Sequence, residues 1–185
     1  MISSQSSQSP ELRIVVVGST GSGKTTLAAQ LAQEFAIPHI ELDALYWGTN
    51  WTEPPREEFR QRVQAALTDF SWVTDGNYRK AQDIIWAKAT DLVWLDYSLL
   101  LIWRRLFKRA VRRIYHQEEL WQGNRESWRG QFFSRDSLFI YAYTSRKRLH
   151  QTYPVLLSQP EYAHLRLHRL HTPGENKFLL QTLNG

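Results

Sequence analysis

Nine residues near the amino terminus, 18–26, constrain the fold of this chain more than any other feature. They read G-S-T-G-S-G-K-T-T and fill every position of the phosphate-loop pattern G-x-x-x-x-G-K-[ST]. The apolar run Leu12–Val17 precedes the loop, and Leu27, Leu31 and Phe35 recur after it at helical spacing. The order is therefore strand, glycine loop, helix, as the motif requires. A flexible glycine–serine linker could match the pattern by chance, but the two flanks disfavour that alternative.

The residue types of this loop suit the binding of a polyphosphate. Glycine permits positive φ angles that bring consecutive backbone N–H groups close to a phosphate, and the helix beginning near Lys24 adds unpaired donors and its dipole. Lys24 is expected to reach the β- and γ-phosphates, and the Thr25 hydroxyl to ligate Mg²⁺. We therefore predict a site for ATP and Mg²⁺ formed by Gly18, Ser19, Thr20, Gly21, Ser22, Gly23, Lys24, Thr25 and Thr26.

Composition excludes several other classes of protein. The 185 residues, 42% of them hydrophobic, suit one folded domain at 11–185 after a disordered polar tail at 1–10. Cysteine is absent, which excludes disulfides and Cys-ligated metal centres and fits a reducing, cytoplasmic compartment. We expect no signal peptide and no membrane span, because no apolar run is long enough. The net charge of +5 is compatible with nucleic acid, nucleotides or phosphorylated substrates.

The chain alternates between short apolar strands and amphipathic helices. After the first strand, we predict strands at 39–42, 70–74, 92–95 and 165–170. We predict helices at 24–35, from an N-cap at Thr52, around 84–86, and at 98–115, 136–150 and 173–183, with an aromatic loop at 43–51. This alternation predicts an α/β fold in which a parallel sheet is covered on both faces, giving three α/β/α layers.

Acidic residues follow three of the predicted strands directly, at Asp43, Asp75 and Asp96. Because ligands of parallel sheets bind at the carboxyl ends of the strands, we expect these carboxylates near the phosphate loop. An aspartate at a strand end can also cap the next turn, so a structural role for Asp43 or Asp75 stays open. The region of about 104–135 is rich in arginine, and we predict that it forms a helical lid. Most of its arginines could equally be solvated or paired.

These motifs together resemble a known group of P-loop NTPases. Asp75-Gly76-x-x-Arg79 resembles the D-G-x-x-R signature of adenylate kinases and related small-molecule kinases. The segments 42–47, 73–78, 94–96 and 123–126 resemble the adenylate-kinase-like ATPases called topology modulation proteins, or FlaR-like proteins. The resemblance implies a five-stranded sheet of order 2-3-1-4-5 and an adenine pocket near the loop after the fifth strand.

The resemblance also implies roles for individual residues. Asp75 would hold Mg²⁺ as the Walker B carboxylate, together with Thr25. Asp43 would orient an acceptor hydroxyl or accept its proton, and Arg79 would clamp a phosphate. Arg109 and Arg125 are the preferred lid arginines, and Thr172 and Pro173 would border the adenine. The predicted catalytic residues are thus Lys24, Asp43, Arg79, Arg109 and Arg125.

The sequence therefore predicts an ATP-binding, Mg²⁺-dependent phosphotransferase acting on a small acceptor such as a nucleoside, a nucleotide or another hydroxyl compound. AMP is disfavoured, because 43–51 replaces the acceptor region of adenylate kinase. In that segment Tyr46, Trp47 and Trp51 could stack on a base or simply pack together. Two other functions stay open: a DNA-associated ATPase or regulator that uses the basic lid, and a nucleotide-binding switch with negligible catalysis.

Overall fold

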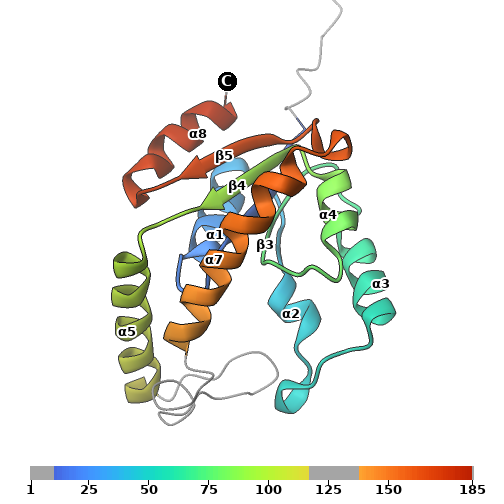
Figure 1. The fold of residues 1–185 in the computed structure, drawn as a ribbon. Helices are drawn as coiled ribbons and strands as arrows, with labels where there is room; N and C mark the ends of the chain where they lie inside the picture. The colour runs from blue at the N-terminus through green and yellow to red at the C-terminus, as the bar shows by residue number, and fades with distance from the viewer. Residues whose placement is uncertain (1–10, 117–137, 185) are drawn as a thin grey trace, which may run out of the picture.

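The computed structural model describes residues 11–116 and 138–184, which form helices around a parallel sheet (Figure 1). The strand order β2-β3-β1-β4-β5 confirms the predicted order, and every pairing is parallel. The strands are β1 Arg13–Gly18, β2 His39–Glu41, β3 Trp72–Asp75, β4 Asp91–Leu95 and β5 Arg166–Leu170. The predicted tail at 1–10 and most of the predicted lid, including Arg125, lie outside the described residues.

Helices cover both faces of this sheet, which confirms the three predicted layers. The α-helices are α1 Lys24–Phe35, α2 Leu42–Tyr46, α3 Arg56–Ala66, α4 Gln82–Lys88, α5 Leu99–His116, α7 Leu138–Leu157 and α8 Asn176–Asn184. Short 3-10 turns are η1 Thr49–Trp51, η3 Pro160–Tyr162 and η4 Pro173–Glu175. In the described ranges, none of these helices combines the length and apolarity needed to cross a bilayer.

The central strand β1 explains why the sheet is buried on both sides. Val15 and Val17 point into the core formed with α3, α4 and α7, whereas Ile14 and Val16 point into the core formed with α1, α5 and α8. A strand covered on both faces needs apolar residues at every position, and these four are at most 1% exposed. The strands at the two edges differ: β2 has three residues, and β5 is largely exposed and reads RLHRL.

The segment after β2 differs from the predicted aromatic loop. Asp43 lies in the short helix α2, and η1 follows before the next long helix. Thr52 does not cap α3: that helix begins at Arg56, and the Thr52 hydroxyl donates to the Thr49 carbonyl at 2.9 Å. The reason is local, because a residue that precedes proline avoids the helical region, and Pro54 and Pro55 are consecutive. The helix therefore starts only after the second proline.

Candidate functional site

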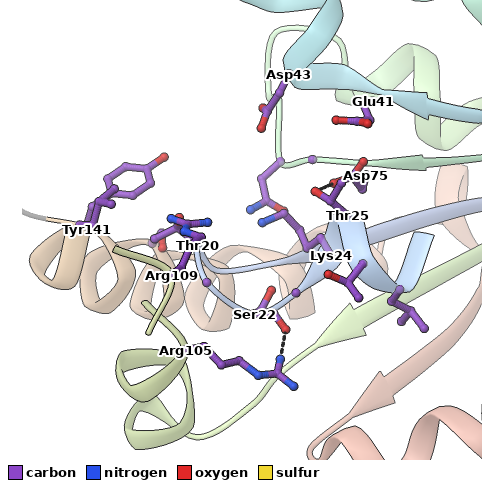
Figure 2. Close-up of a pocket in the computed structure, with 18 of the residues that line it drawn as sticks. Thr20, Ser22, Lys24, Thr25, Glu41, Asp43, Asp75, Arg105, Arg109 and Tyr141 are labelled. Atoms are coloured by element: carbon purple, nitrogen blue, oxygen red, sulfur yellow. Dashed lines mark hydrogen bonds between the residues drawn. The ribbon is translucent and has the colours of Figure 1, made fainter. Parts of the chain in front are cut away.

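A cavity of about 1490 Å³ lies where the phosphate loop meets the carboxyl ends of the strands. Figure 2 shows Arg105 and Arg109 on one side of the loop and the carboxylates of Asp43 and Asp75 on the other. The predicted site residues that line the cavity are Thr20, Gly21, Ser22, Gly23, Lys24, Thr25, Thr26, Asp43, Asp75, Arg79, Arg109 and Pro173. Among the predicted site residues that the structure describes, three do not line this cavity: Gly18, Ser19 and Thr172.

Two glycines show why the loop tolerates little else. Gly21 has a φ of 76°, and a Cβ atom there would lie 2.6 Å from Cγ of Leu106 on α5. Gly23 has a φ of 92° and precedes the first residue of α1. It offers no side-chain cap, and the first turn of α1 contains no acidic residue. The N-terminal amides of α1 therefore suit an external anion.

The loop also contains two buried hydroxyl groups. The side-chain oxygens of Ser19 and Ser22 are buried and have no hydrogen-bond partner among the described residues. Buried polar atoms normally have a partner, but Ser19 does not line the cavity and Ser22 is fully buried, so these two oxygens do not face the space open to a ligand. The backbone carbonyl of Ser22, unlike its side chain, has a partner: it accepts a hydrogen bond from the guanidinium of Arg105. Arg105 also lies over the ring of Tyr97, with 5.1 Å from its Cζ to the ring centroid.

Lys24 carries the charge of the loop. Its Nζ donates a hydrogen bond to the Ser19 carbonyl at 3.2 Å, which holds the side chain along the loop. Burial lowers the pKa of Lys24, the carboxylates of Asp75 and Asp43 oppose this shift, and Arg109 adds to it. A bound polyphosphate would stabilise the charged ammonium and raise this pKa again.

Asp75 links the loop to the neighbouring strand. The Thr25 hydroxyl donates to Asp75 Oδ2 at 2.6 Å, and His39 Nε2 lies 2.9 Å from Asp75 Oδ1. Within the described ranges, no group of three or more His, Cys, Asp or Glu residues could hold a metal ion. Mg²⁺ needs no such group, because it keeps several waters and uses one or two protein oxygens beside phosphate oxygens. Thr25 and Asp75 fit that pattern. Sequence reasoning missed His39, whose only signal was its place on the edge strand.

Asp43 faces the cavity from α2 and is held from another element. The hydroxyl of Tyr78, which follows β3, donates to Asp43 Oδ1. Burial and the charge of Asp43 raise the pKa of Tyr78 far above its usual range, so the hydroxyl keeps its proton and donates at neutral pH. Arg79, beside it, is exposed and also lines the cavity. Tyr78 had not been predicted as a site residue.

Aromatic residues form the wall of the cavity next to Asp43. Trp47 and Trp51 meet edge to face, with ring centroids 5.5 Å apart. The Tyr46 hydroxyl bonds Glu53, and Lys80 Nζ donates to both, at 2.5 Å to Tyr46 and 3.0 Å to Glu53. Trp51 has a φ of 58°, an uncommon angle for a bulky residue. The predicted aromatic segment thus lines the site, and its members also pack on each other.

Asp96 is separated from the other two strand-end carboxylates. It is not a lining residue of the cavity in the part of the chain that the structure describes. Its Oδ1 accepts from Arg146 at 3.1 Å and lies 2.6 Å from His150 Nε2, and its Oδ2 accepts from Arg169 at 2.7 Å. The expectation that all three aspartates converge beside the loop is therefore wrong for Asp96, because cations from α7 and β5 enclose it.

Comparisons with known proteins agree with this arrangement. No family model matches the chain. It is 54% identical to an adenylate kinase from Streptomyces griseus over 35 residues, which are 19% of this chain and 97% of that sequence. Shikimate kinase from Bacteroides thetaiotaomicron aligns at 17% identity and a TM-score of 0.52, over 93% of this chain and 95% of the other. Shikimate kinase from Acinetobacter baumannii, in complex with shikimate, aligns at 13% identity and a TM-score of 0.54, over 95% and 92%.

At these identities the solved structures show the fold and not the substrate. The strand order, the phosphate loop and these neighbours together show a P-loop kinase fold like that of shikimate kinase. The local match to an adenylate kinase agrees with that fold.

Proposed function

We propose that this chain, with its P-loop kinase fold, is an ATP-dependent phosphotransferase that moves the γ-phosphoryl group of ATP to a hydroxyl group of a small acceptor. One observation carries the proposal: a phosphate loop and two differently held carboxylates line one cavity. Asp75 accepts a hydrogen bond from Thr25, at the end of the loop. Asp43 accepts one from Tyr78 and lies apart from that pair (Figure 2). The two carboxylates can therefore serve different reactants.

The donor half of the reaction would use the phosphate loop. Backbone amides of the loop and of the first turn of α1 would bind the β- and γ-phosphates, and the Lys24 ammonium would lie against them. Mg²⁺, held by Thr25, Asp75 and phosphate oxygens, would supply charge neutralisation and orientation. Pro173 lines the cavity from the loop after β5, so we place the adenine near Pro173 and Thr172.

The acceptor half would use Asp43. Its carboxylate would orient the acceptor hydroxyl and take its proton as the oxygen attacks the γ-phosphorus. A new phosphorus–oxygen bond forms, the bond to the bridging oxygen of ADP breaks, and ADP leaves. Arg79 and Arg109 both line the cavity, where their guanidinium groups would stabilise charge on the transferred group. A catalytic role for Arg125 stays a prediction, as does the resemblance to topology modulation proteins.

The acceptor is the least constrained part of the proposal. The aromatic wall of Trp47 and Trp51 and the polar group formed by Tyr46, Glu53 and Lys80 suit a ring-containing hydroxyl compound. Nucleosides, nucleotides and other hydroxylated rings therefore form the first screening panel. The segment replaces the AMP-binding region expected in adenylate kinase, so AMP enters the panel as a disfavoured candidate.

The test is ADP release in the presence of ATP, Mg²⁺ and this panel. We expect one class of acceptor to stimulate ADP release, and Lys24→Ala to abolish the stimulated rate. Lys147→Ala is the matched control, because Lys147 is exposed on α7 and does not line the cavity. Normal turnover by a folded Lys24→Ala variant would refute the proposal. Stimulation by DNA instead of small acceptors would favour a DNA-associated ATPase.

A further inference from the structure

We infer that Asn77 is a positioning residue that holds the first peptide of the phosphate loop and thereby sets the affinity of the site for ATP. The inference rests on the proposed function. It concerns a side chain that sequence reasoning assigned no role, in the segment between β3 and α4.

One side-chain amide of Asn77 binds both backbone groups of Gly18. The Gly18 N–H donates to Asn77 Oδ1 at 3.1 Å, and Asn77 Nδ2 donates to the Gly18 carbonyl at 2.5 Å. The Tyr153 hydroxyl, from α7, donates to the same Oδ1 at 3.4 Å. A carboxamide is suited to this task, because it offers a donor and an acceptor side by side. Neither aspartate nor alanine can make both bonds.

The hydrogen bonds between Asn77 and Gly18 lie just beyond the last paired residues of β1 and β3. The regular pairing of β1 with β3 stops at Val16 and Asp75, and the Gly76 N–H then donates to the Val16 carbonyl at 3.2 Å. Beyond this point the segment after β3 contacts β1 through the side chain of Asn77 and not through its backbone. It reaches Gly18, the last residue of β1 and the first of the loop.

Gly18 is confined from the other side as well. A Cβ atom on Gly18 would lie 2.9 Å from the Leu95 carbonyl oxygen of β4 and 2.8 Å from the Ser22 side-chain oxygen. The backbone therefore passes closely between β4 and the rest of the loop, while Asn77 binds it from the β3 side. This arrangement fixes the direction of the peptide that enters the loop.

The same segment holds both ends of the loop. Asp75 accepts the hydrogen bond of Thr25, at the start of α1, and Asn77 binds Gly18. The residue after Gly18 is Ser19, whose carbonyl accepts hydrogen bonds from Lys24 Nζ at 3.2 Å and from the Ser22 N–H at 3.2 Å. A displaced Gly18 would therefore displace the anchor of Lys24. Affinity for a ligand improves when its site is already in the binding geometry, because less order is lost on binding.

The test compares Asn77→Ala and Asn77→Asp with Asn184→Ala, a control on α8 whose side chain bonds the Leu180 carbonyl, far from the loop in sequence. Loss of two hydrogen bonds that hold the loop is expected to weaken ATP binding about tenfold to a hundredfold. The aspartate keeps an acceptor for the Gly18 N–H but loses the donor and adds a negative charge. Its ATP affinity should therefore fall at least as far as that of the alanine variant.

Two readouts separate positioning from general damage. Adenosine, which lacks phosphates, should bind the wild type and both variants equally by competition, because the base site does not depend on Gly18. Hydrogen exchange of the Gly18 amide, measured by NMR without ligand, should accelerate in Asn77→Ala and stay as in the wild type in Asn184→Ala.

The possible outcomes are distinct. Wild-type ATP affinity in a folded Asn77→Ala variant, or equal loss of ATP and adenosine binding, would overturn the inference. If the alanine variant does not fold, Asn77→Asp decides by the same criteria. If the wild type binds no ATP, the proposed function fails. In that case, unchanged hydrogen exchange of the Gly18 amide in the variants would also refute the positioning role. Faster exchange would support only the statement that Asn77 holds Gly18 in place.

Discussion

The close approach of the phosphate loop to α5 gives a prediction whose size follows from the structure. In Gly21→Ala, the new Cβ would lie 2.6 Å from Leu106 Cγ and 2.8 Å from Leu106 Cδ2. Leu106 is only 2% exposed, so its side chain cannot move into solvent. A φ of 76° costs an L-residue about 1–2 kcal/mol, and overpacking a buried site costs about 1–3 kcal/mol. We expect the free energy of unfolding to fall by roughly 2–5 kcal/mol.

Thermal or urea unfolding, followed by circular dichroism, measures this loss. For a chain of this size the loss corresponds to a melting temperature lower by roughly 4–20 °C. Gly174→Ala is the control, since the nearest atom to its added Cβ is Thr172 Oγ1 at 3.9 Å, and its stability should change by less than about 1 kcal/mol. If Gly21→Ala unfolds like Gly174→Ala and binds ATP normally, the described approach of the loop to α5 is wrong.

Three further predictions concern the site itself. Tyr78→Phe removes the hydrogen bond to Asp43, so turnover in steady-state kinetics should fall about tenfold. The dissociation constant of ATP, measured by calorimetry, should stay unchanged. A loss of ATP affinity would contradict the assignment of Asp43 to the acceptor. Because burial lowers the pKa of Lys24 and phosphate binds its charged form, ATP affinity should decrease as pH rises through that lowered pKa, and this slope should vanish in Lys24→Ala. ATP at a hundred times its dissociation constant should raise the free energy of unfolding by about 2.7 kcal/mol, which is measurable as a higher melting temperature. Any further stabilisation that Mg²⁺ adds to that of ATP should be lost in Asp75→Asn.

Local sequence patterns were sufficient for the parallel sheet and the loop, whereas the order of the strands had been implied by the family resemblance. The run Leu12–Val17, the glycines and the helix from Lys24 are consecutive in the chain, so their order alone predicted β1, the loop and α1. The regular alternation of the remaining strands and helices predicted the parallel sheet in the same way. Turn chemistry was less informative, as Thr52 shows: it has the residue type of an N-cap, but two consecutive prolines delay the helix.

Contacts between distant residues could not be predicted from spacing. Asp75 and Asp96 each follow a strand predicted from the sequence, but Asp75 is the last residue of β3 and lines the cavity, whereas Asp96 follows β4 and does not line it in the described part of the chain. The difference comes from Arg146, His150 and Arg169, which lie more than 40 residues further along the chain and enclose Asp96. Tertiary packing likewise brings together Asn77 and Gly18, which are 59 residues apart.

The edges of the sheet limit how copies of this protein can associate. An open edge strand can pair with a strand of another molecule and so start aggregation. Here one edge, β2, is three residues long, and the other, β5, carries Arg166, His168 and Arg169 in five residues. A short edge offers few backbone partners, and on the other edge Arg166 and Arg169 pair with Asp91 and Asp96, which places charged side chains along β5. Growth of the sheet from one molecule to the next is therefore disfavoured at both edges.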